Sequence, residues 1–376
     1  MQYGRGMRTW IGTGLALLIA AAVATVGVVL TRDTEPSAVV TPTPKTPAAE
    51  TVAEGLEVPW DIAFLSESRA LITERPGRVR LLANGKLRPE PVLTVETSQG
   101  GEGGLQGLAL DPDFERNRTV YLYVSEGSGD GLTNRVARYR LDDTDRLVEP
   151  RILLDDIPGN NNHNGGRLHF GPDDKLYVTT GDAQNPDQAQ ERDSLAGKIL
   201  RLDRDGSAPP DNPFGNRAWS YGHRNPQGLA WSEDGRLFST EHGPSGEFGL
   251  CCRDELNRVE RGGNYGWPLI TGKQTRFGLG TPILTSGNTE AWAPASLTFW
   301  NGKLYFGALR GEHLHEVTLE DGGVAADREY FQGEFGRIRT AAVGPDGALY
   351  LFTSNRDGRG KVRPGDDKLV RVNRLE

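Results

Sequence analysis

Residues 168–182, LHFGPDDKLYVTTGD, predict two short β-strands joined by a tight polar turn. Apolar and β-branched residues on both sides of a Gly-Pro-Asp-Asp turn are typical of a β-hairpin. The same pattern occurs in five other stretches, which begin at Ile62, Leu108, Leu229, Leu297 and Ala341. Six such hairpins indicate an all-β chain built from repeated units.

A segment of alternating charged and apolar residues follows each hairpin, as in KILRLDRDG at 198–206. Such alternation is typical of a strand with one exposed face. Each unit therefore has at least three strands, and the units lie roughly 45–65 residues apart, as blades of a β-propeller do. The last unit ends directly after its third strand, and residues 51–56 could supply the fourth and close the ring. We expect a six-bladed propeller of four-stranded antiparallel blades over 51–376, because a β-sandwich with insertions would leave the six copies unexplained.

The first 50 residues differ from the repeats. Residues 1–9 carry two arginines and no acid, and residues 10–30 are apolar apart from two threonines, long enough to cross a bilayer as a helix. A cleaved signal peptide and an uncleaved membrane anchor both fit, and the anchor is favoured because the apolar run continues past the A-x-A-like site. Either predicts export of the remainder. Residues 31–50 are rich in Thr, Pro and Ala, and we expect a disordered linker there.

The composition limits the partners of the chain. It contains 51 acidic and 43 basic residues, for a net charge of −8, which argues against nucleic acid as a partner. The 49 glycines and 23 prolines indicate many turns and little helix.

The first candidate site lies in NNNHNGGRLHFGP at 160–172. Propellers bind ligands at one end of the central channel, on loops that enter or leave the inner strands. His163 precedes an inner strand, and Gly165 and Gly166 allow a ligand or backbone to approach it closely. Asp182 ends the same hairpin and could orient the imidazole and raise its basicity. A lone histidine is more often structural, but the flanking asparagines and glycines favour a functional one.

Two further loops carry polar residues next to predicted inner strands. Arg224 and Asn225 lie in YGHRNPQGLAW, where the arginine is either a solvated surface charge or a clamp for an anion or carbonyl. Gly243 and Pro244 end the fourth hairpin. Turn carbonyls are good ligands for hard cations, although composition alone does not make this turn a metal site.

Three arginines are predicted to converge on the same end of the channel. Arg337 and Arg339 share one face of the extended segment before the last inner strand, and Arg310 ends the fifth hairpin. Converging guanidinium groups repel one another unless an anion lies between them. The arginines therefore indicate a polyanionic ligand.

Cys251 and Cys252 are adjacent and are the only two cysteines. In an exported protein they could form a vicinal disulfide, pair between molecules or stay reduced. No redox catalysis follows from them.

The order HNGGRL, GD, HRNPQG, EHGP, DELN, GGNYGWP and RIR resembles the glucose/sorbosone dehydrogenase family of soluble quinoproteins, from residue 59 to the C terminus. The resemblance implies a six-bladed propeller that binds pyrroloquinoline quinone (PQQ) and Ca²⁺ and oxidises aldose sugars at C1 to lactones. It implies that His163 takes the proton of the C1 hydroxyl while hydride passes to C5 of the quinone, with Asp182 supporting His163.

The resemblance also implies roles for the other candidates. Arg224 and Asn225 would polarise the quinone oxygens, and Arg310, Arg337 and Arg339 would bind its carboxylates. Main-chain oxygens of Gly243 and Pro244 would hold Ca²⁺ on the quinone. A second, structural Ca²⁺ site would be formed by the remaining predicted ligands, which are Asp254, Glu255 and the Tyr265 carbonyl.

Three positions depart from the pattern of the best-known glucose dehydrogenases. Glu102 stands where a glutamine near the active site is expected and is a further candidate cofactor contact, Asn162 replaces an aspartate, and Arg310 replaces a lysine. These departures are compatible with cofactor binding, but they leave the preferred sugar unidentified. The rival functions are a Ca²⁺-dependent lactonase, which would leave the converging arginines without a role, and a binding module, which the joint presence of His163, Arg224 and Asn225 disfavours. The expected partners are an aldose, an unidentified electron acceptor and, through the N-terminal segment, a membrane.

Overall fold

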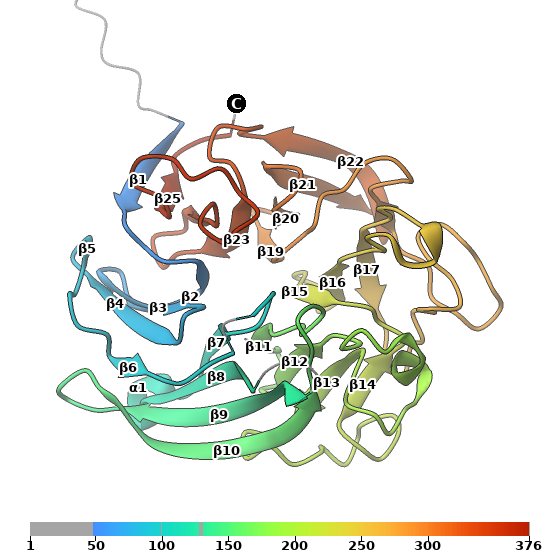
Figure 1. The fold of residues 1–376 in the computed structure, drawn as a ribbon, viewed down its shortest axis with the longest axis horizontal. Coiled ribbons are helices and arrows are strands. Elements are labelled where there is room, and N and C mark those ends of the chain that lie inside the picture. The colour runs from blue at the N-terminus through green and yellow to red at the C-terminus, as the bar shows by residue number, and fades with distance from the viewer. Residues whose placement is uncertain (1–47, 99, 128–130, 376) are drawn as a thin grey trace, which may run out of the picture. The chain divides into compact units, whose positions relative to one another are not determined.

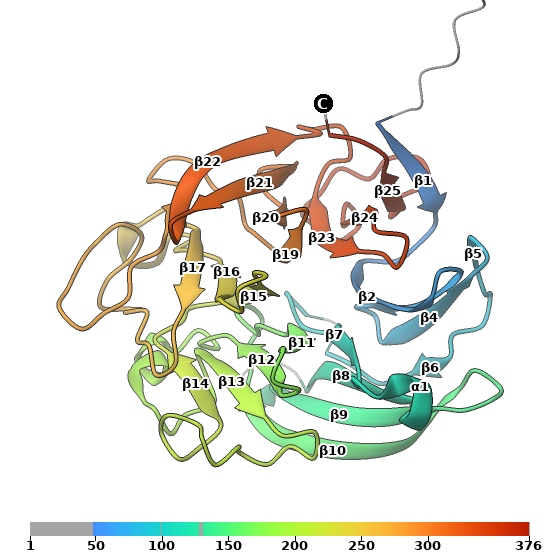
Figure 2. The ribbon, with the colours of Figure 1, turned by 180° about the vertical axis from the view of Figure 1, so that it is seen from behind.

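A computed structural model describes residues 48–98, 100–127 and 131–375. These residues form a ring of six β-sheets around a central channel, as Figures 1 and 2 show from the two ends. The predicted six-bladed propeller is confirmed. The predicted membrane or signal segment at 1–30 and nearly all of the linker lie outside the described residues. No helix in the described part of the chain is long and apolar enough to span a membrane.

Five blades are formed by consecutive segments of chain, and in each of them the first strand lies next to the channel. From the channel outward, the first blade contains β2 (Pro59–Ser66), β3 (Arg69–Glu74), β4 (Arg78–Ala83) and β5 (Lys86–Leu87), and the second contains β7 (Leu105–Leu110), β8 (Thr119–Glu126), β9 (Thr133–Leu141) and β10 (Leu147–Pro158). The third blade contains β11 (Leu168–Phe170), β12 (Leu176–Thr180), β13 (Lys198–Leu202) and β14 (Ala218–Tyr221), and the fourth contains β15 (Pro226–Trp231), β16 (Leu237–Glu241), β17 (Glu255–Val259) and β18 (Leu284–Thr285). The fifth blade contains β19 (Thr298–Trp300), β20 (Lys303–Ala308), β21 (His313–Glu320) and β22 (Gly323–Tyr330). A short strand, β6 (Leu93–Thr94), also pairs with β4. The described helices are short: α1 (Phe114–Asn117) and the 3₁₀ turns η2 (Pro186–Gln190) and η3 (Glu247–Gly249).

The sixth blade joins the two ends of the propeller. Its inner three strands are β23 (Ile338–Val343), β24 (Leu349–Thr353) and β25 (Leu369–Val372), and β1 (Ala49–Ala53) pairs antiparallel with β25 as the outermost strand. The prediction that an N-terminal segment closes the ring is confirmed. The strand lies at 49–53 rather than 51–56, because the backbone N–H groups of Gly55 and Leu56 instead donate to carbonyls of the loop that precedes β25.

We expect a truncated chain that begins at Gly55 to unfold at a markedly lower temperature than one that begins at Ala48. The shorter chain loses β1, which leaves the edge of β25 unpaired and removes Ala53 from the apolar cluster between the last and first blades. Thermal unfolding followed by circular dichroism compares the two chains. Equal melting temperatures would show that the closure contributes no stability.

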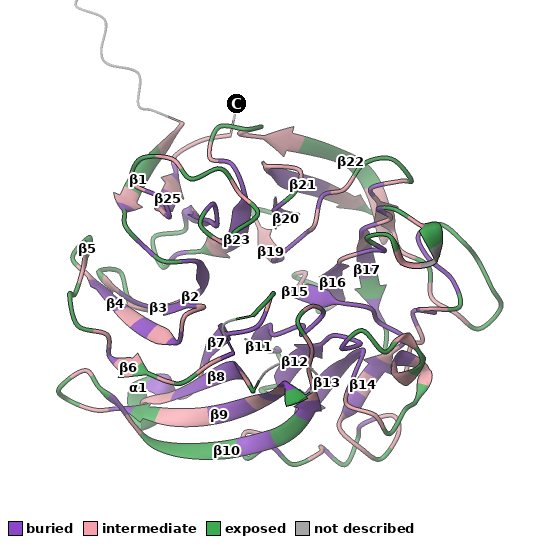
Figure 3. Ribbon diagram, viewed as in Figure 1, coloured by how far each residue is buried: buried purple, intermediate pink, exposed green. Residues whose placement is uncertain are grey.

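Buried apolar side chains gather between neighbouring blades rather than at the channel. Leu71 and Leu81 of the first blade, for example, pack with Leu105 and Leu122 of the second. Five similar clusters fill the other contacts between blades. Figure 3 shows the consequence, with buried inner strands and exposed stretches along the outer strands β10 and β22. The channel is thus free to carry polar groups.

The repeated strand order decides where a site can form. Because each blade repeats the same order, the inner strands all begin at the same end of the channel. The loops that precede an inner strand and those that follow a second strand therefore meet at that end. The predicted catalytic and cofactor-binding residues come from these loops or from the first residues of the inner strands.

Candidate active site

His163 and Asp182 form a buried pair at the end of the channel where the inner strands begin, which we call the channel mouth. His163 precedes β11, and its Nδ1 lies 2.7 Å from Oδ1 of Asp182, which follows β12. The other carboxylate oxygen, Oδ2, accepts a hydrogen bond from Trp267 Nε1 at 2.7 Å. Because an ionised carboxylate can only accept, the proton of the imidazole resides on Nδ1 and Nε2 keeps its lone pair. The pair therefore presents a basic nitrogen at Nε2, held in one orientation.

Glycines fix the backbone of His163, which has a φ of +64°. A Cβ on Gly181 would lie 1.9 Å from the His163 carbonyl oxygen, and one on Gly165 would lie 2.5 Å from the Thr179 oxygen. Gly165 was predicted to admit a ligand or backbone, and it is the protein's own backbone that approaches. Its N–H donates to Oδ1 of the fully buried Asn225 at 3.0 Å. Asn225 thereby holds the His163 loop in place.

Arg224 lies beside the free nitrogen of His163. Its guanidinium group pairs with Glu247, whose Oε1 is 3.6 Å from His163 Nε2. The same group donates to the His242 carbonyl at 3.1 Å and packs over the Trp267 ring. The predicted proximity of Arg224 to His163 and Asp182 is therefore present in the structure.

Glu102 connects the two sides of the mouth. Its Oε2 accepts from the His163 N–H at 3.2 Å, and its Oε1 pairs with Arg359 at 2.8 Å. Burial alone would raise the pKa of this carboxyl, but the surrounding positive groups outweigh it and lower the pKa to about 2. His242 stays neutral near pH 7 because burial lowers its pKa to about 4, so Arg359 supplies the stabilising charge there. Glu102 is therefore ionised across the neutral range.

The three predicted cofactor arginines differ in their surroundings. Arg337 is held by two hydrogen bonds to Asp357 Oδ2 and one to the Leu309 carbonyl. Arg339 is equally buried, but its one hydrogen-bonded partner in the described part of the chain is the neutral Gln227 side chain, at 2.7 Å. Burial lowers the pKa of Arg339 to about 9, although Asp357 and other carboxylates nearby oppose the shift. Arg310 has an exposed side chain and joins none of these interactions, so its contact with a cofactor stays a prediction.

Three buried nitrogens at this end have no hydrogen-bond partner among residues 48–375 as described: Arg224 Nε, Arg339 Nε and His242 Nε2. Buried donors without partners cost free energy that a bound acceptor would recover. Two of the three belong to guanidinium groups, which bind carboxylate and carbonyl oxygens. An anionic ligand rich in such oxygens, as PQQ is, fits this donor set.

Four of the five predicted metal ligands, which come from both predicted Ca²⁺ sites, line one small cavity behind Arg224. The cavity has a volume of about 10 Å³, the size that holds one water or one ion, and it is lined by Arg224, Glu241, His242, Gly243, Pro244, Glu255, Tyr265, Trp267, Ile270 and Thr271. Glu241 and Glu255 face each other across β16 and β17. Burial, and then repulsion from Glu241, raise the pKa of Glu255 to about 8. A hard cation between these carboxylates would relieve that repulsion, so the site fits Ca²⁺.

Asp254 does not line this cavity. Its Oδ1 accepts from the Gly243 N–H, and its Oδ2 accepts from the N–H groups of Trp292 and Ala293 at 2.7 and 2.9 Å. These bonds hold two loops together, so the Asp254 side chain is a positioning group in this structure. Its predicted role as a ligand is untested.

Cys251 and Cys252 form a disulfide with each other, one of the three states that the sequence left open. The Cys252 N–H donates to the Pro244 carbonyl at 2.9 Å. A Cβ on Gly243 would lie 2.0 Å from the Cys252 carbonyl oxygen, so only glycine fits there. The disulfide thus backs the turn that carries two of the predicted metal ligands.

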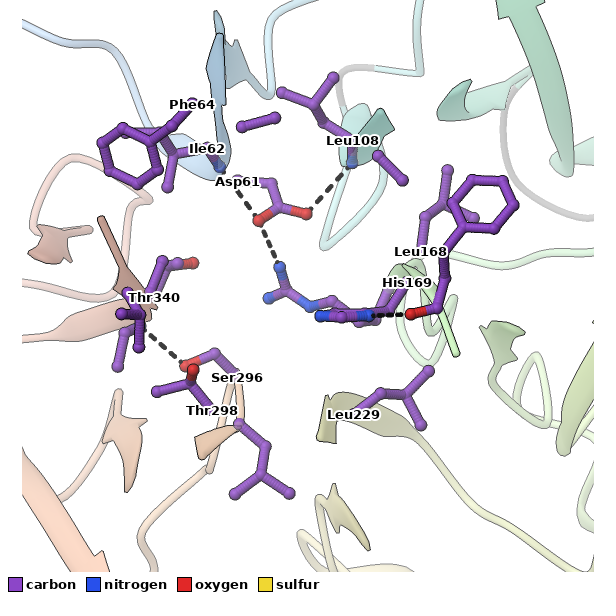
Figure 4. A pocket seen from close by; sticks show the side chains of 18 of the residues that line it. Asp61, Ile62, Phe64, Leu108, Leu168, His169, Leu229, Ser296, Thr298 and Thr340 are labelled. Atoms are coloured by element: carbon purple, nitrogen blue, oxygen red, sulfur yellow. Dashed lines mark hydrogen bonds and ion pairs between the residues drawn. The ribbon is translucent and has the colours of Figure 1, made fainter. Parts of the chain in front are cut away.

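A larger cavity, of about 370 Å³, lies at the other end of the channel. The Asp61–Arg167 ion pair, with an N–O distance of 2.7 Å, lines it, and Figure 4 shows Asp61 and His169 beside apolar side chains such as Leu108. None of the predicted catalytic or cofactor residues contributes to its lining. It does not compete with the mouth as the candidate active site.

Several residues at the mouth were missed from the sequence. Arg359 and Asp357 come from the RDGRG loop after β24, and Glu241 and Trp267 come from segments chosen for other residues. The loop after β24 follows a second strand, so its place in the repeat was the available signal.

A family model described as glucose/sorbosone dehydrogenase matches residues 56–369. The chain belongs to the glucose/sorbosone dehydrogenase family. Membership makes it an oxidoreductase, in agreement with the resemblance of its motifs. The aldose sugar dehydrogenase YliI of Escherichia coli is 34% identical over 349 residues, which cover 84% of this chain and 92% of the relative.

Two solved structures are similar to this chain in both fold and sequence. A putative oxidoreductase (glucose dehydrogenase) of Thermus thermophilus has a TM-score of 0.81 and 46% identity, covering 86% of this chain and 98% of that one. The PQQ-bound aldose sugar dehydrogenase of Streptomyces coelicolor has a TM-score of 0.80 and 37% identity, covering 87% and 97%.

Proposed function

We propose that this chain oxidises aldose sugars at C1 to lactones, with PQQ and Ca²⁺ bound at the channel mouth. The observation that carries the proposal is the His163–Asp182 pair, which presents a basic nitrogen at the same end of the channel as two buried guanidinium groups, those of Arg224 and Arg339, whose Nε atoms have no hydrogen-bond partner among the described residues. The PQQ-bound relative from Streptomyces coelicolor supports the choice of cofactor. When bound, PQQ supplies the acceptor for the hydride from C1.

The residues of the chain supply the proton chemistry and the binding. His163 Nε2 takes the proton of the C1 hydroxyl, and Asp182 stabilises the resulting imidazolium through Nδ1. Arg339 and Arg224 would bind oxygens of the quinone, Arg224 giving up its pairing with Glu247 to do so. Asn225 and Glu102 position the backbone on which His163 is carried. Arg310 and Arg337 would contribute positive charge at longer range.

Ca²⁺ would bind where Glu241 and Glu255 meet, with carbonyls of Gly243, Pro244 and Tyr265 around it. A lactonase metal centre at the mouth would leave the buried guanidinium groups of Arg224 and Arg339 without a role, which favours the dehydrogenase. The apolar N-terminal segment supports an extracytoplasmic enzyme that is membrane-anchored or secreted.

The proposal is tested by reconstituting the purified chain with PQQ and Ca²⁺ and following dye reduction with a panel of aldoses. We expect reduction with at least one aldose, and none when either PQQ or sugar is omitted. A chain that binds PQQ, as seen in its absorption spectrum, but reduces no dye with any aldose would be a binding module. Hydrolysis of a lactone without PQQ would instead support the lactonase.

We expect Ca²⁺ to raise the melting temperature more at pH 8 than at pH 5.5. The usual pKa of a glutamate is about 4.3, and that of Glu255 is raised to about 8. Between these values the folded metal-free chain binds more protons than the unfolded chain, so its free energy of unfolding falls as pH rises. Ca²⁺ must displace the Glu255 proton, which is easier at pH 8.

Scanning calorimetry with and without Ca²⁺ at the two pH values measures this effect. The Glu255→Gln variant should lose most of the stabilisation by Ca²⁺, whereas Glu233→Gln, at an exposed turn, should keep it. An equal Ca²⁺-induced shift at both pH values would contradict a protonated Glu255.

A further inference from the structure

Two histidines and two acids lie on one face of the fifth blade, on strands that the proposed reaction does not use. His313 and His315 are two residues apart on β21, so their side chains share a face of the sheet. Glu329 of β22 is directly opposite His315, and Asp327 is opposite Val317 on the same face. The two imidazoles are 2% and 1% exposed. They are buried beneath Trp292 and Phe306, whose rings lie 4.8 and 4.6 Å from the His315 ring.

In each imidazole, the nitrogen that faces away from the other histidine lies within hydrogen-bonding distance of an acceptor. His313 Nδ1 lies 3.1 Å from the Gly311 carbonyl, and His315 Nε2 lies 3.1 Å from Asp327 Oδ2. A carbonyl and an ionised carboxylate can only accept, so these two nitrogens carry the protons. His313 Nε2 and His315 Nδ1 are then left with lone pairs.

These two lone pairs face each other together with a carboxylate. The two nitrogens are 3.1 Å apart, and Glu329 Oε1 lies 3.6 Å from one and 3.9 Å from the other. Three acceptors without a hydrogen between them repel one another unless a cation or a proton joins them.

The spacing matches the distances of a metal centre. Zinc binds imidazole nitrogen and carboxylate oxygen at about 2.0–2.2 Å, so two ligand atoms of a tetrahedral site lie about 3.4 Å apart. The three distances of 3.1, 3.6 and 3.9 Å bracket that value. Asp327, on the far side of His315, holds the ring as carboxylates commonly hold metal-binding histidines.

We propose that His313, His315 and Glu329 bind a first-row transition-metal dication, for which Zn²⁺ is the best match, with water completing the coordination. Two neutral imidazoles and a carboxylate suit Zn²⁺ better than Ca²⁺, which prefers oxygen ligands. The Glu329 side chain is 25% exposed, which gives the ion a route from solvent. The ion would link β21 to β22 and support the Trp292 segment, whose N–H is bonded to Asp254. The site is separate from the proposed calcium site and does not depend on the proposed function.

Isothermal titration of tag-free, chelator-treated chain with ZnCl₂, in constant excess Ca²⁺, tests the proposal. We expect one Zn²⁺ per chain, with affinity at least tenfold weaker in Glu329→Gln and His315→Gln. Asp327→Asn should weaken it about 10- to 100-fold, because Asp327 only orients a ligand. His169→Gln, a histidine substitution on β11, is the matched control and should bind as the unmodified chain does.

The proposal is wrong if the unmodified chain binds no Zn²⁺, or if the Glu329 and His315 variants bind it as the unmodified chain does. Circular dichroism establishes whether each variant folds, and Glu329→Gln is conservative because that side chain is partly exposed. If the variants do not fold, a zinc-soaked crystal of the unmodified chain decides. An ion between the three side chains supports the site, and zinc bound elsewhere refutes it.

Discussion

The His163→Gln variant, reconstituted with PQQ and Ca²⁺, is expected to oxidise aldoses about 10²–10⁴ times more slowly than the unmodified chain. Glutamine can still donate to Asp182, so the buried carboxylate keeps a partner. It has no basic nitrogen to place at the position of Nε2, so the C1 hydroxyl must lose its proton without assistance. Steady-state dye reduction measures kcat, and the PQQ absorption spectrum measures cofactor binding.

The pattern of the two measurements distinguishes catalysis from positioning. We expect kcat to fall while the dissociation constant of PQQ changes less than a few-fold. The matched control is His169→Gln, which substitutes the histidine at the opposite end of the channel and should leave both quantities unchanged. If His163→Gln weakens PQQ binding and leaves kcat intact at saturating cofactor, the role of His163 as a base is wrong.

The propeller was predictable because its signal is repeated six times along the chain. Each hairpin is local, so strand pairs such as β11 with β12 follow from neighbouring residues. Closure of the ring was also predictable, since the last unit lacked a fourth strand. The exact bounds of β1 were not, because they depend on hydrogen bonds to the loop before β25 that no local pattern reveals.

The candidate site was predictable where a residue is placed by its own blade. His163 and Asp182 flank one hairpin, and the repeat alone brings them to the same end. The Arg359–Glu102 pair joins residues 257 positions apart and exists only because the ring closes. Asp254 shows a different limit: its oxygens accept from three backbone N–H groups of two loops, and the sequence does not show that these loops meet.

The His-x-His pair on β21 lies in a segment whose strand structure was predicted correctly, but the sequence did not reveal the cluster that the two histidines form. The alternating segment that follows the fifth hairpin is HLHEVTLEDGG at 313–323, and its alternation places His313 and His315 on one face of a strand. Sequence alone could not show that the face is buried under Trp292, or that β22 brings Glu329 opposite. The proposed metal site therefore depends on burial and cross-strand register, which only the structure shows.

Replacing Arg339 by methionine is expected to weaken PQQ binding and to stabilise the cofactor-free chain. The dissociation constant of PQQ should rise roughly 30-fold or more, because a buried charged hydrogen bond to the ligand is lost. The cofactor-free chain should melt at a higher temperature than the unmodified chain. Arg339 is buried with a neutral partner and an unpaired Nε, so removing its charge relieves a cost of folding.

Arg337→Met is the informative comparison, because Arg337 is equally buried but paired. Its removal leaves Asp357 without its ion-pair partner, so the cofactor-free chain should melt at a lower temperature. A PQQ titration of Arg339→Met and melting curves of both variants without cofactor measure the three predicted changes. An Arg339→Met chain that is less stable and binds PQQ normally would mean that the guanidinium group serves the fold. A more stable chain with weakened PQQ binding would mean that its charge is kept, at a cost in stability, for an anionic ligand.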